Sequence, residues 1–104
     1  MRTFTRLLIA SGALLSLGAQ ALTGEEIMTK AGCTACHAKD KKLVGPALKD
    51  VAAKYKGQDV VAKLMAKVRA GGSGVYGPIP MSPNPPAKIS DTDLKAAVEW
   101  ILKL

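Results

Sequence analysis

The chain has few of the residues from which metal and redox sites are usually built. Its 104 residues include two cysteines and one histidine, and they contain no internal repeat. A structural zinc site takes four nitrogen or sulfur ligands, so these three side chains leave such a site one ligand short. No segment alternates polar and apolar residues in the manner of a half-buried strand. The sequence therefore argues against a zinc module and favours an all-α domain.

The N-terminal part lacks an apolar run long enough to cross a membrane. Its apolar stretch from Leu7 to Leu17 has 11 residues, whereas a spanning helix needs ~20. It follows Arg2 and Arg6 and precedes an Ala-x-Ala pattern that ends at Ala21. This order of basic, apolar and small residues is typical of a secretory signal peptide rather than a membrane anchor. We expect cleavage after Ala21 and export to the periplasm, without stable insertion into the membrane.

The predicted signal peptide is residues 1–21, which leaves one domain of residues 22–104. The formal net charge falls from +7 to +5, because two of the 15 basic residues, Arg2 and Arg6, leave with the signal peptide. A domain of 83 residues buries a modest share of its surface and usually needs an additional stabilising link. A covalently held cofactor would supply one.

Both cysteines and the histidine lie in one motif, Cys33-Thr34-Ala35-Cys36-His37. A Cys-x-x-Cys-His run is typical of a c-type haem attachment site. Cys33 and Cys36 would form thioethers with the haem vinyl groups, and His37 would ligate the iron. In an exported protein the cysteines could instead form a disulfide, and a thioredoxin-like motif would need a strand–helix–strand setting that is missing here. Only the haem interpretation uses all three residues, so we predict one covalently attached haem c.

Capping and periodicity signals predict about four short helices around that haem. The expected helices run from Thr23 to about Ala31, from Pro46 to Gly57, from about Asp59 to Ala70, and from Ser90 to about Lys103. Residues 71–87 between the last two are rich in glycine and proline. We expect them to form a long irregular loop without a helix or a central strand, and such loops are usually functional.

A second axial ligand decides what a haem protein does, and methionine is the candidate here. Residues 22–104 contain Met28, Met65 and Met81 and no histidine besides His37. Met65 lies on an apolar helical stripe, which indicates core packing, and Met28 is too close in sequence to Cys33 to reach the opposite haem face. Met81 lies 44 residues after His37 in a proline-rich loop, where no helical stripe accounts for it. Ligation by Met and His is typical of electron-transfer cytochromes, whereas an open sixth site would suit gas binding or peroxide chemistry.

The order of these motifs resembles that of the small class I bacterial cytochromes c, in particular the cytochrome c-551 type, also called cytochrome c8. The matching stretches are Gly-Cys-Thr-Ala-Cys-His at 32–37, Val-Gly-Pro-Ala at 44–47, residues 49–55, Gly-Val-Tyr-Gly-Pro-Ile-Pro-Met at 74–81, and Trp-Ile-Leu at 100–102. They cover essentially the whole mature chain in order. The resemblance implies the small class I cytochrome c fold.

The resemblance also implies roles for single residues close to the haem. Cys33 and Cys36 match the thioether residues, His37 the proximal ligand and Met81 the distal one. A ligating histidine donates its other ring N–H to an acceptor, and the resemblance assigns that acceptor to the carbonyl of Pro46.

Further residues match positions that tune the site in this family. Asn84 falls where an amide hydrogen-bonds the ligating sulfur. Tyr76 stands where a tryptophan often reaches a haem propionate, and Lys67 where an arginine can do so. Ser82 replaces a common proline after the ligand, and residues 85–87 lengthen the loop that follows it.

We therefore predict a periplasmic, monomeric electron carrier of a respiratory chain, and not an enzyme. The resemblance suggests a membrane cytochrome complex of the bc1 type as donor, and a nitrite reductase, a cytochrome oxidase or a similar protein as acceptor. The alternatives are a peroxidase-like haem enzyme and a gas-binding haem protein, both with an open sixth site. The lysines are spread over helices and turns rather than forming one run, so we expect no binding to nucleic acid. Some of them could steer an acidic redox partner.

Overall fold

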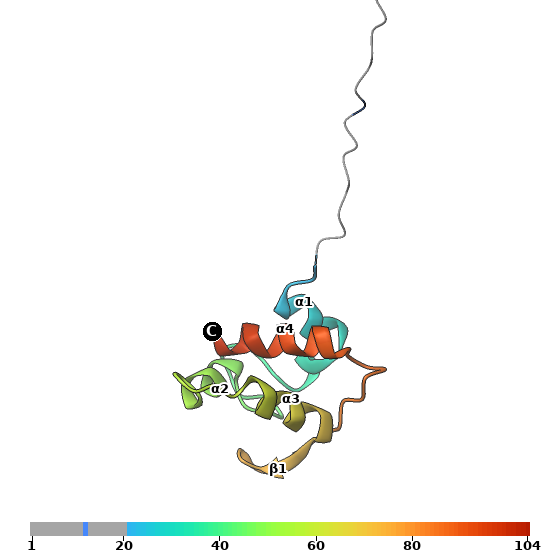
Figure 1. Ribbon diagram of the computed structural model, residues 1–104. Helices are drawn as coiled ribbons and strands as arrows, with labels where there is room; N and C mark the ends of the chain where they lie inside the picture. Colours follow the sequence, from blue (N-terminus) through green and yellow to red (C-terminus); the bar gives the residue numbers. More distant parts are fainter. Residues whose placement is uncertain (1–11, 13–20) are drawn as a thin grey trace, which may run out of the picture.

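The computed structural model describes Gly12 and residues 21–104. The predicted signal peptide, residues 1–21, lies outside the described residues except at Gly12 and Ala21, so its cleavage stays a prediction. The elements of the described part are α1 (Gly24–Lys30), the 3-10 helix η1 (Cys33–Ala35), α2 (Leu48–Lys54), α3 (Val61–Ala70), β1 (Gly72–Gly74), β2 (Gly77–Met81) and α4 (Asp91–Leu102) (Figure 1). None of these helices is long and apolar enough to span a bilayer. The prediction of an all-α fold with about four short helices is confirmed.

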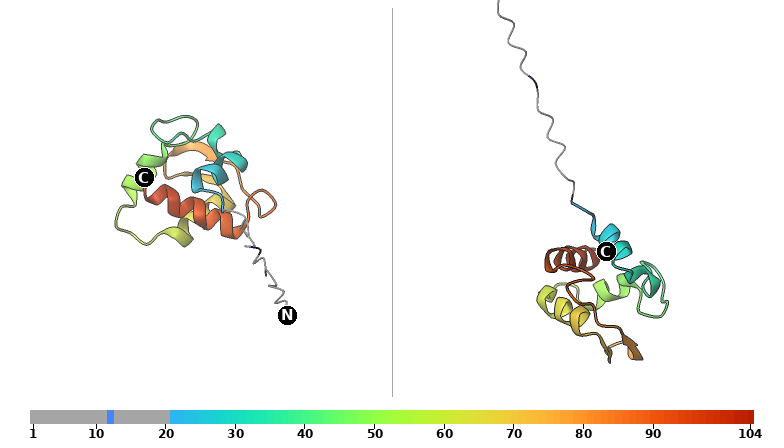
Figure 2. Two further views of the ribbon diagram at one scale, coloured as in Figure 1. Left: turned by 90° about the horizontal axis from the view of Figure 1, so that it is seen from above. Right: turned by 90° about the vertical axis from the view of Figure 1, so that its right-hand side faces the viewer.

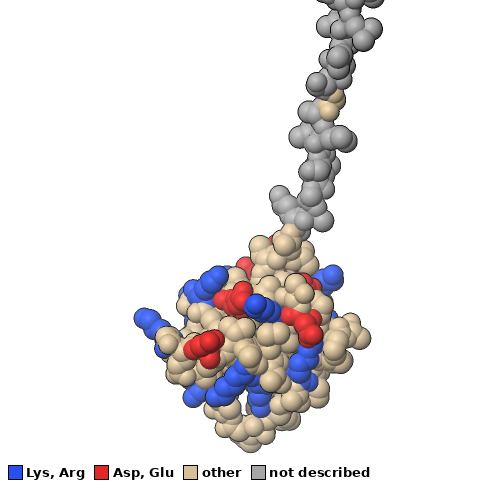
Figure 3. All heavy atoms as spheres, in the orientation of Figure 1, with Lys and Arg blue, Asp and Glu red and all other residues tan. Residues whose placement is uncertain are grey.

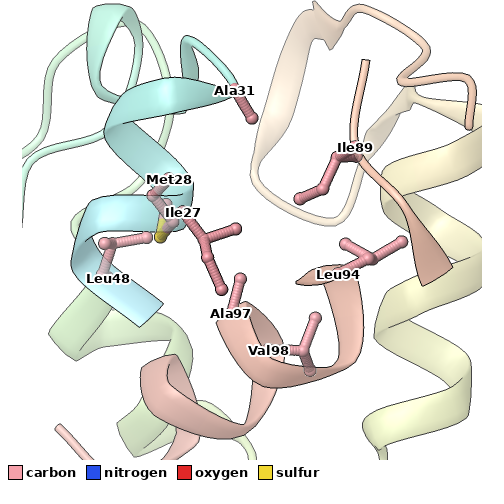
Figure 4. Close-up of a cluster of buried hydrophobic side chains, with 8 residues drawn as sticks. All are labelled: Ile27, Met28, Ala31, Leu48, Ile89, Leu94, Ala97 and Val98. Carbon is pink, nitrogen blue, oxygen red and sulfur yellow. The ribbon is translucent and has the colours of Figure 1, made fainter. Parts of the chain in front are cut away.

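Helix α4 is the element on which the other helices pack. It contacts α1, α2 and α3, and Figure 1 shows it lying between α1 on one side and α2 and α3 on the other. Its apolar face is buried, with Leu94, Ala97 and Val98 only 2–3% exposed. Figure 4 shows these side chains meeting Ile27 of α1 and Ile89 from the segment that leads into α4. This cluster is the core of the domain.

The two helices that cross in this core begin where their capping residues predict. At α1 the Thr23 hydroxyl accepts from the Glu26 N–H at 3.2 Å, and the Glu26 carboxylate accepts from the Thr23 N–H at 3.3 Å. This reciprocal pair confirms the predicted capping box. At α4 the Ser90 hydroxyl accepts from the Asp93 N–H at 3.2 Å.

The predicted starts of the two middle helices are wrong by two residues. Helix α2 begins at Leu48 and not at Pro46, because the intervening Ala47 is extended, with ψ 140°. Helix α3 begins at Val61 rather than Asp59. Capping and periodicity fix a helix end only to within a residue or two. At α2 the difference matters, because it leaves the Pro46 carbonyl outside the helix and available to another partner.

The prediction that residues 71–87 form one long irregular loop is wrong. Strands β1 and β2 form an antiparallel hairpin in which Gly72 pairs with Met81 and Gly74 with Gly77, with an irregularity between the two pairs. Pro78 and Pro80 lie between the paired residues Gly77 and Met81 and are not themselves at the paired positions, so their missing N–H groups leave both pairs intact. The hairpin lies at the end of the domain opposite α1 (Figure 1; Figure 2, right). The irregular chain begins only after Met81.

Candidate haem site

A left-handed glycine joins α1 to the attachment motif. Gly32 has φ +80°, a conformation that glycine adopts without the steric cost that other residues incur. The chain then makes one tight turn, in which the N–H groups of Cys36 and His37 donate to the Cys33 carbonyl at 3.2 and 3.0 Å. The two thiols and the imidazole therefore come from a single turn.

Both cysteines are free thiols in the structure. Cys33 is half-buried and packs against the core cluster, whereas Cys36 is exposed. Burial raises the pKa of the Cys33 thiol, and the positive charge of Lys88 offsets part of that rise. The structure thus shows two unpaired thiols on one turn, an arrangement that suits attachment to a haem.

The environment of His37 defines which of its ring nitrogens can bind a metal. Its Nδ1 lies 2.9 Å from the Pro46 carbonyl oxygen. A carbonyl can only accept, so Nδ1 carries the proton and donates, which leaves the lone pair of Nε2 for a ligand. Gly45 packs directly on the ring, because a Cβ there would overlap Cε1 and lie 2.9 Å from Nδ1. The Gly45 N–H also donates to the Cys36 carbonyl at 2.8 Å, which ties this turn to the attachment motif.

The three methionines of the described region lie in different surroundings. Met28 is 4% exposed and belongs to the core cluster. Met65 is partly buried and packs against the same cluster. Met81 lies outside it, as the last residue of β2, and is partly buried.

The main chain of Met81 is fixed from two directions. Gly72 pairs with it across the hairpin. Gly71, which ends α3 with φ +68°, packs so closely that a Cβ there would overlap the Met81 carbonyl and lie 2.9 Å from the Pro83 nitrogen. The end of α3 therefore fixes the position of the Met81 main chain relative to the helices.

Asn84 is 4% exposed, and it is the only buried polar residue within residues 21–104. Its Nδ2 donates to the carbonyls of Val68 at 3.1 Å and Ser82 at 3.0 Å. These two bonds use both amide hydrogens. The amide thereby ties the chain after Met81 to α3, and a hydrogen bond from Asn84 to the Met81 sulfur stays a prediction.

Tyr76 and Lys67 both lie at the hairpin. Tyr76 is 43% exposed in the turn between the strands, and the Lys54 ammonium lies 5.9 Å from its ring centroid. Burial raises the pKa of the Tyr76 phenol, and the negative charges of Tyr55 and Asp50 add to this. The Lys67 ammonium lies beside Gly72 of β1, 3.3 Å from where a Cβ would stand. The propionate contacts that the resemblance implies for these two residues stay predictions.

Arg69 is a residue of this region that the sequence reasoning missed. From the last turn of α3 its guanidinium donates to the Asn84 carbonyl at 3.0 Å, to the Ile89 carbonyl at 2.7 Å and to the Asp91 carboxylate at 2.6 Å. One signal was present in the sequence, because Arg69 is the only arginine among the 13 basic residues of positions 22–104. An arginine where every other basic residue is a lysine indicates a position at which a planar guanidinium makes several hydrogen bonds.

The apolar surface around the site fits a large apolar ligand. Leu43 and Val44 in the segment after His37 are 41% and 52% exposed, and Val75 and Ile79 of the hairpin are 52% and 60% exposed. Exposed large aliphatic side chains in the segment after His37 and in the hairpin that carries Met81 are available to cover an apolar ligand. Two free thiols, an imidazole with a free Nε2 and these side chains together fit a covalently attached haem.

Comparisons with known proteins agree with this chemistry. The family model for cytochrome c matches residues 21–104. The chain is 54% identical over 81 residues to cytochrome c-551 of Azotobacter vinelandii, covering 77% of this chain and 95% of that protein. It is 51% identical over 82 residues to cytochrome c2 of Rubrivivax gelatinosus, covering 78% and 96%. The crystal structure of wild-type Nitrosomonas europaea cytochrome c552 matches with a TM-score of 0.71 at 48% identity, over 77% of this chain and 98% of that one.

The chain therefore belongs to the cytochrome c family, and within it to the class I proteins of the c-551 type. This confirms the resemblance found in the sequence. The protein is a mono-haem electron-transfer cytochrome and not an enzyme, and it carries one covalently attached haem c.

Proposed function

We propose that this cytochrome carries single electrons in the periplasm with His37 and Met81 as the axial ligands of its haem iron. In this proposal Cys33 and Cys36 hold the haem through thioethers. The mature protein is a monomer of residues 22–104. It accepts electrons from a membrane cytochrome complex of the bc1 type and delivers them to a nitrite reductase, a cytochrome oxidase or a similar respiratory acceptor.

The observation that carries the axial assignment is the sorting of the methionines. Met28 and Met65 pack in or against the core cluster, where their thioethers serve as apolar filling. Met81 is held by main-chain contacts to β1 and to the end of α3, and its side chain is left out of that cluster. Among the described methionines it alone neither belongs to the core cluster nor packs against it.

The His37 side of the site supports the same assignment. The bond from Nδ1 to the Pro46 carbonyl fixes the ring orientation and the tautomer, and such a bond raises the basicity of the ligating nitrogen. Gly45 lies against the ring, so the imidazole has little freedom to rotate.

The mechanism needs the protein to change little when an electron moves. When bound, the haem supplies an iron that gains or loses one electron. The hydrogen bond of His37 and the main-chain contacts of Met81 would hold both ligands in place in either oxidation state. The reorganisation energy of electron transfer is therefore small. Leu43, Val44 and Ile79 are exposed apolar side chains that would be available to keep water from a bound haem, and both such exclusion and Met ligation raise the reduction potential.

The charge distribution supports recognition of an acidic partner. Without the signal peptide the formal net charge is +5, since Arg2 and Arg6 are removed from a total of +7. On the face drawn in Figure 3, lysines and arginines are interspersed with acidic residues rather than forming one continuous basic surface. This arrangement favours weak steering of a protein partner over tight binding to a polyanion.

Carbon monoxide separates this proposal from the two alternatives. A haem with both axial positions occupied by His37 and Met81 should bind carbon monoxide slowly or not at all when reduced, and should turn over no peroxide. Rapid carbon monoxide binding, followed as a shift of the Soret band after mixing, would contradict the closed site. It would favour the gas-binding or peroxidase-like function instead.

A further inference from the structure

The segment between Met81 and α4, residues 82–90, has little structure of its own. It contains no helix or strand. Its internal main-chain bonds are the turn in which the N–H groups of Lys88 and Ile89 donate to the Pro85 carbonyl at 2.9 and 3.3 Å. Its position therefore depends on bonds to other parts of the domain.

Arg69 supplies two of those bonds from one side chain. Two of its three partners are the carbonyls of Asn84 and Ile89, which lie near the two ends of the segment, and the third is Asp91 in the first turn of α4. A guanidinium has five N–H donors in a rigid fork and can serve three acceptors at once, whereas a lysine ammonium offers one nitrogen. We call this set of three bonds the Arg69 clamp.

The two carbonyl bonds of the clamp should outweigh its ion pair. The Arg69 side chain is 21% exposed, whereas the Asp91 side chain is 83% exposed. Exposed ion pairs contribute little to stability. Hydrogen bonds from a charged donor to a partly buried carbonyl contribute more, because breaking them strands the acceptor away from water.

The clamp connects directly to the chain that carries Met81. Asn84 is three residues beyond Met81, and its N–H donates to the carbonyls of Val68 and Arg69 at 3.2 and 3.3 Å. Its side chain bonds Val68 and Ser82. Asn84 is therefore held to the end of α3 through its N–H, its side chain and its carbonyl, and the last of these contacts belongs to the clamp.

We propose that Arg69 is a positioning residue that controls how readily Met81 leaves its place as an axial ligand. Movement of Met81 away from the site has to carry residues 82–84 with it, and the clamp opposes that movement. This inference rests on the proposed ligation by Met81. It adds that a residue outside the predicted ligand set sets the ease with which an external ligand replaces the methionine.

Four variants of the haem-loaded protein distinguish the contributions of the three bonds of the clamp. Arg69→Leu removes all three bonds, and Arg69→Lys keeps the charge and one donor nitrogen. Asp91→Asn removes the ion pair and leaves both carbonyl bonds. Lys49→Leu is the matched control, because it breaks an exposed ion pair of the same 2.6 Å length, to Asp40, away from residues 82–90.

The first measurement is the affinity of the oxidised protein for imidazole, which competes with Met81 for the iron. Loss of the carbonyl bonds in Arg69→Leu should raise this affinity about tenfold or more, since a hydrogen bond from a charged donor changes an equilibrium by such a factor. Arg69→Lys should fall between Arg69→Leu and wild type. Asp91→Asn and Lys49→Leu should stay within about twofold of wild type.

The second measurement is amide hydrogen exchange, which does not depend on ligand binding. Arg69→Leu should speed exchange at Asn84 and Ile89 while the amides of α1 keep their protection. An unchanged imidazole affinity in Arg69→Leu, or faster exchange spread evenly over all helices, would overturn the proposal in favour of a purely structural role. If oxidised wild-type protein lacks a sulfur-to-iron absorption band, the ligation by Met81 fails instead, and the exchange data still decide whether the clamp restrains the segment.

Discussion

A single hydrogen bond determines what His37 offers to a metal. The Cys-x-x-Cys-His motif indicates that His37 is the ligand, but the tautomer of its ring depends on which acceptor lies beside Nδ1. The Pro46 carbonyl takes that place at 2.9 Å because α2 starts two residues later than its sequence signals suggest. The absence of a side chain at Gly45 lets the turn come close enough to the ring. The ligand type was therefore readable from the motif, and the resemblance also named the Pro46 carbonyl as its acceptor, whereas the close approach of Gly45 to the ring required the fold.

Gly45→Ala tests this close approach. The new Cβ would overlap the His37 ring, so we expect a loss of about 1–3 kcal/mol in the free energy of unfolding and a lower yield of haem-loaded protein. Denaturant unfolding and the haem-to-protein absorbance ratio measure the two effects. Gly57→Ala is the control, because Gly57 also has a positive φ, +77°, but a Cβ there would meet no atom within 4 Å. This variant should lose about 1–2 kcal/mol in the free energy of unfolding through backbone strain. Its haem loading should be unchanged. Equal haem loading in Gly45→Ala and wild type would contradict the account.

Tyr76 gives a prediction about pH. Burial raises the pKa of its phenol above the ordinary value of 10.0, so the unfolded chain releases this proton at a lower pH than the folded one. Stability should therefore be lost as the pH rises through the folded pKa, above about pH 10. In Tyr76→Phe this part of the loss should disappear, so its free energy of unfolding should fall less than that of wild type between about pH 9 and pH 11. Parallel curves for the two proteins would contradict the shift.

At the scale of elements, the helices followed from local signals and the hairpin did not. Thr23 and Ser90 cap α1 and α4 through bonds that lie within three residues, so the sequence alone predicts them. The hairpin depends on which backbone donors face a partner strand, and the prolines of β2 fit because they lie between Gly77 and Met81, which hold the paired positions. Composition signals count prolines without regard to that placement. The Arg69 clamp is likewise formed by groups up to 22 residues apart, beyond the reach of any local pattern.

The crossing of α1 and α4 gives a prediction in which two effects compete. Gly24→Ala improves the helix propensity of α1 by at most ~1 kcal/mol, but its Cβ would overlap Trp100 Cβ of α4. Because both positions are close to the main chain, the helices would have to move apart, at a cost of about 1–3 kcal/mol. We expect a net loss of stability in denaturant unfolding. A variant as stable as wild type, or more so, would show that the two helices are not tightly packed here.

For the whole molecule, charge governs encounter with partners more than it governs the fold. The four ion pairs of the described region join side chains that are mostly exposed to water, so they contribute little to stability. The excess of positive charge instead creates a long-range field. The excess of positive charge follows directly from the sequence, whereas the choice of partner also depends on the surfaces of the partner proteins.

Electron transfer with a purified acidic acceptor should therefore depend on salt. Raising the ionic strength shortens the range of the field, and we expect the second-order rate constant to fall on the order of tenfold from low to high salt. Stopped-flow mixing of the reduced cytochrome with the acceptor measures it. A rate that is independent of ionic strength would contradict steering by charge.

The claim on which the whole account depends is that Met81 is the second axial ligand, and the absorption spectrum of the oxidised protein tests it most directly. Ligation by a thioether gives a sulfur-to-iron charge-transfer band, which wild-type protein should show. Met81→Leu should lose this band, whereas Met65→Leu, which alters a methionine packed against the core cluster, should keep it. A wild-type protein without the band, or a Met81→Leu variant that retains it, would contradict the assignment of Met81.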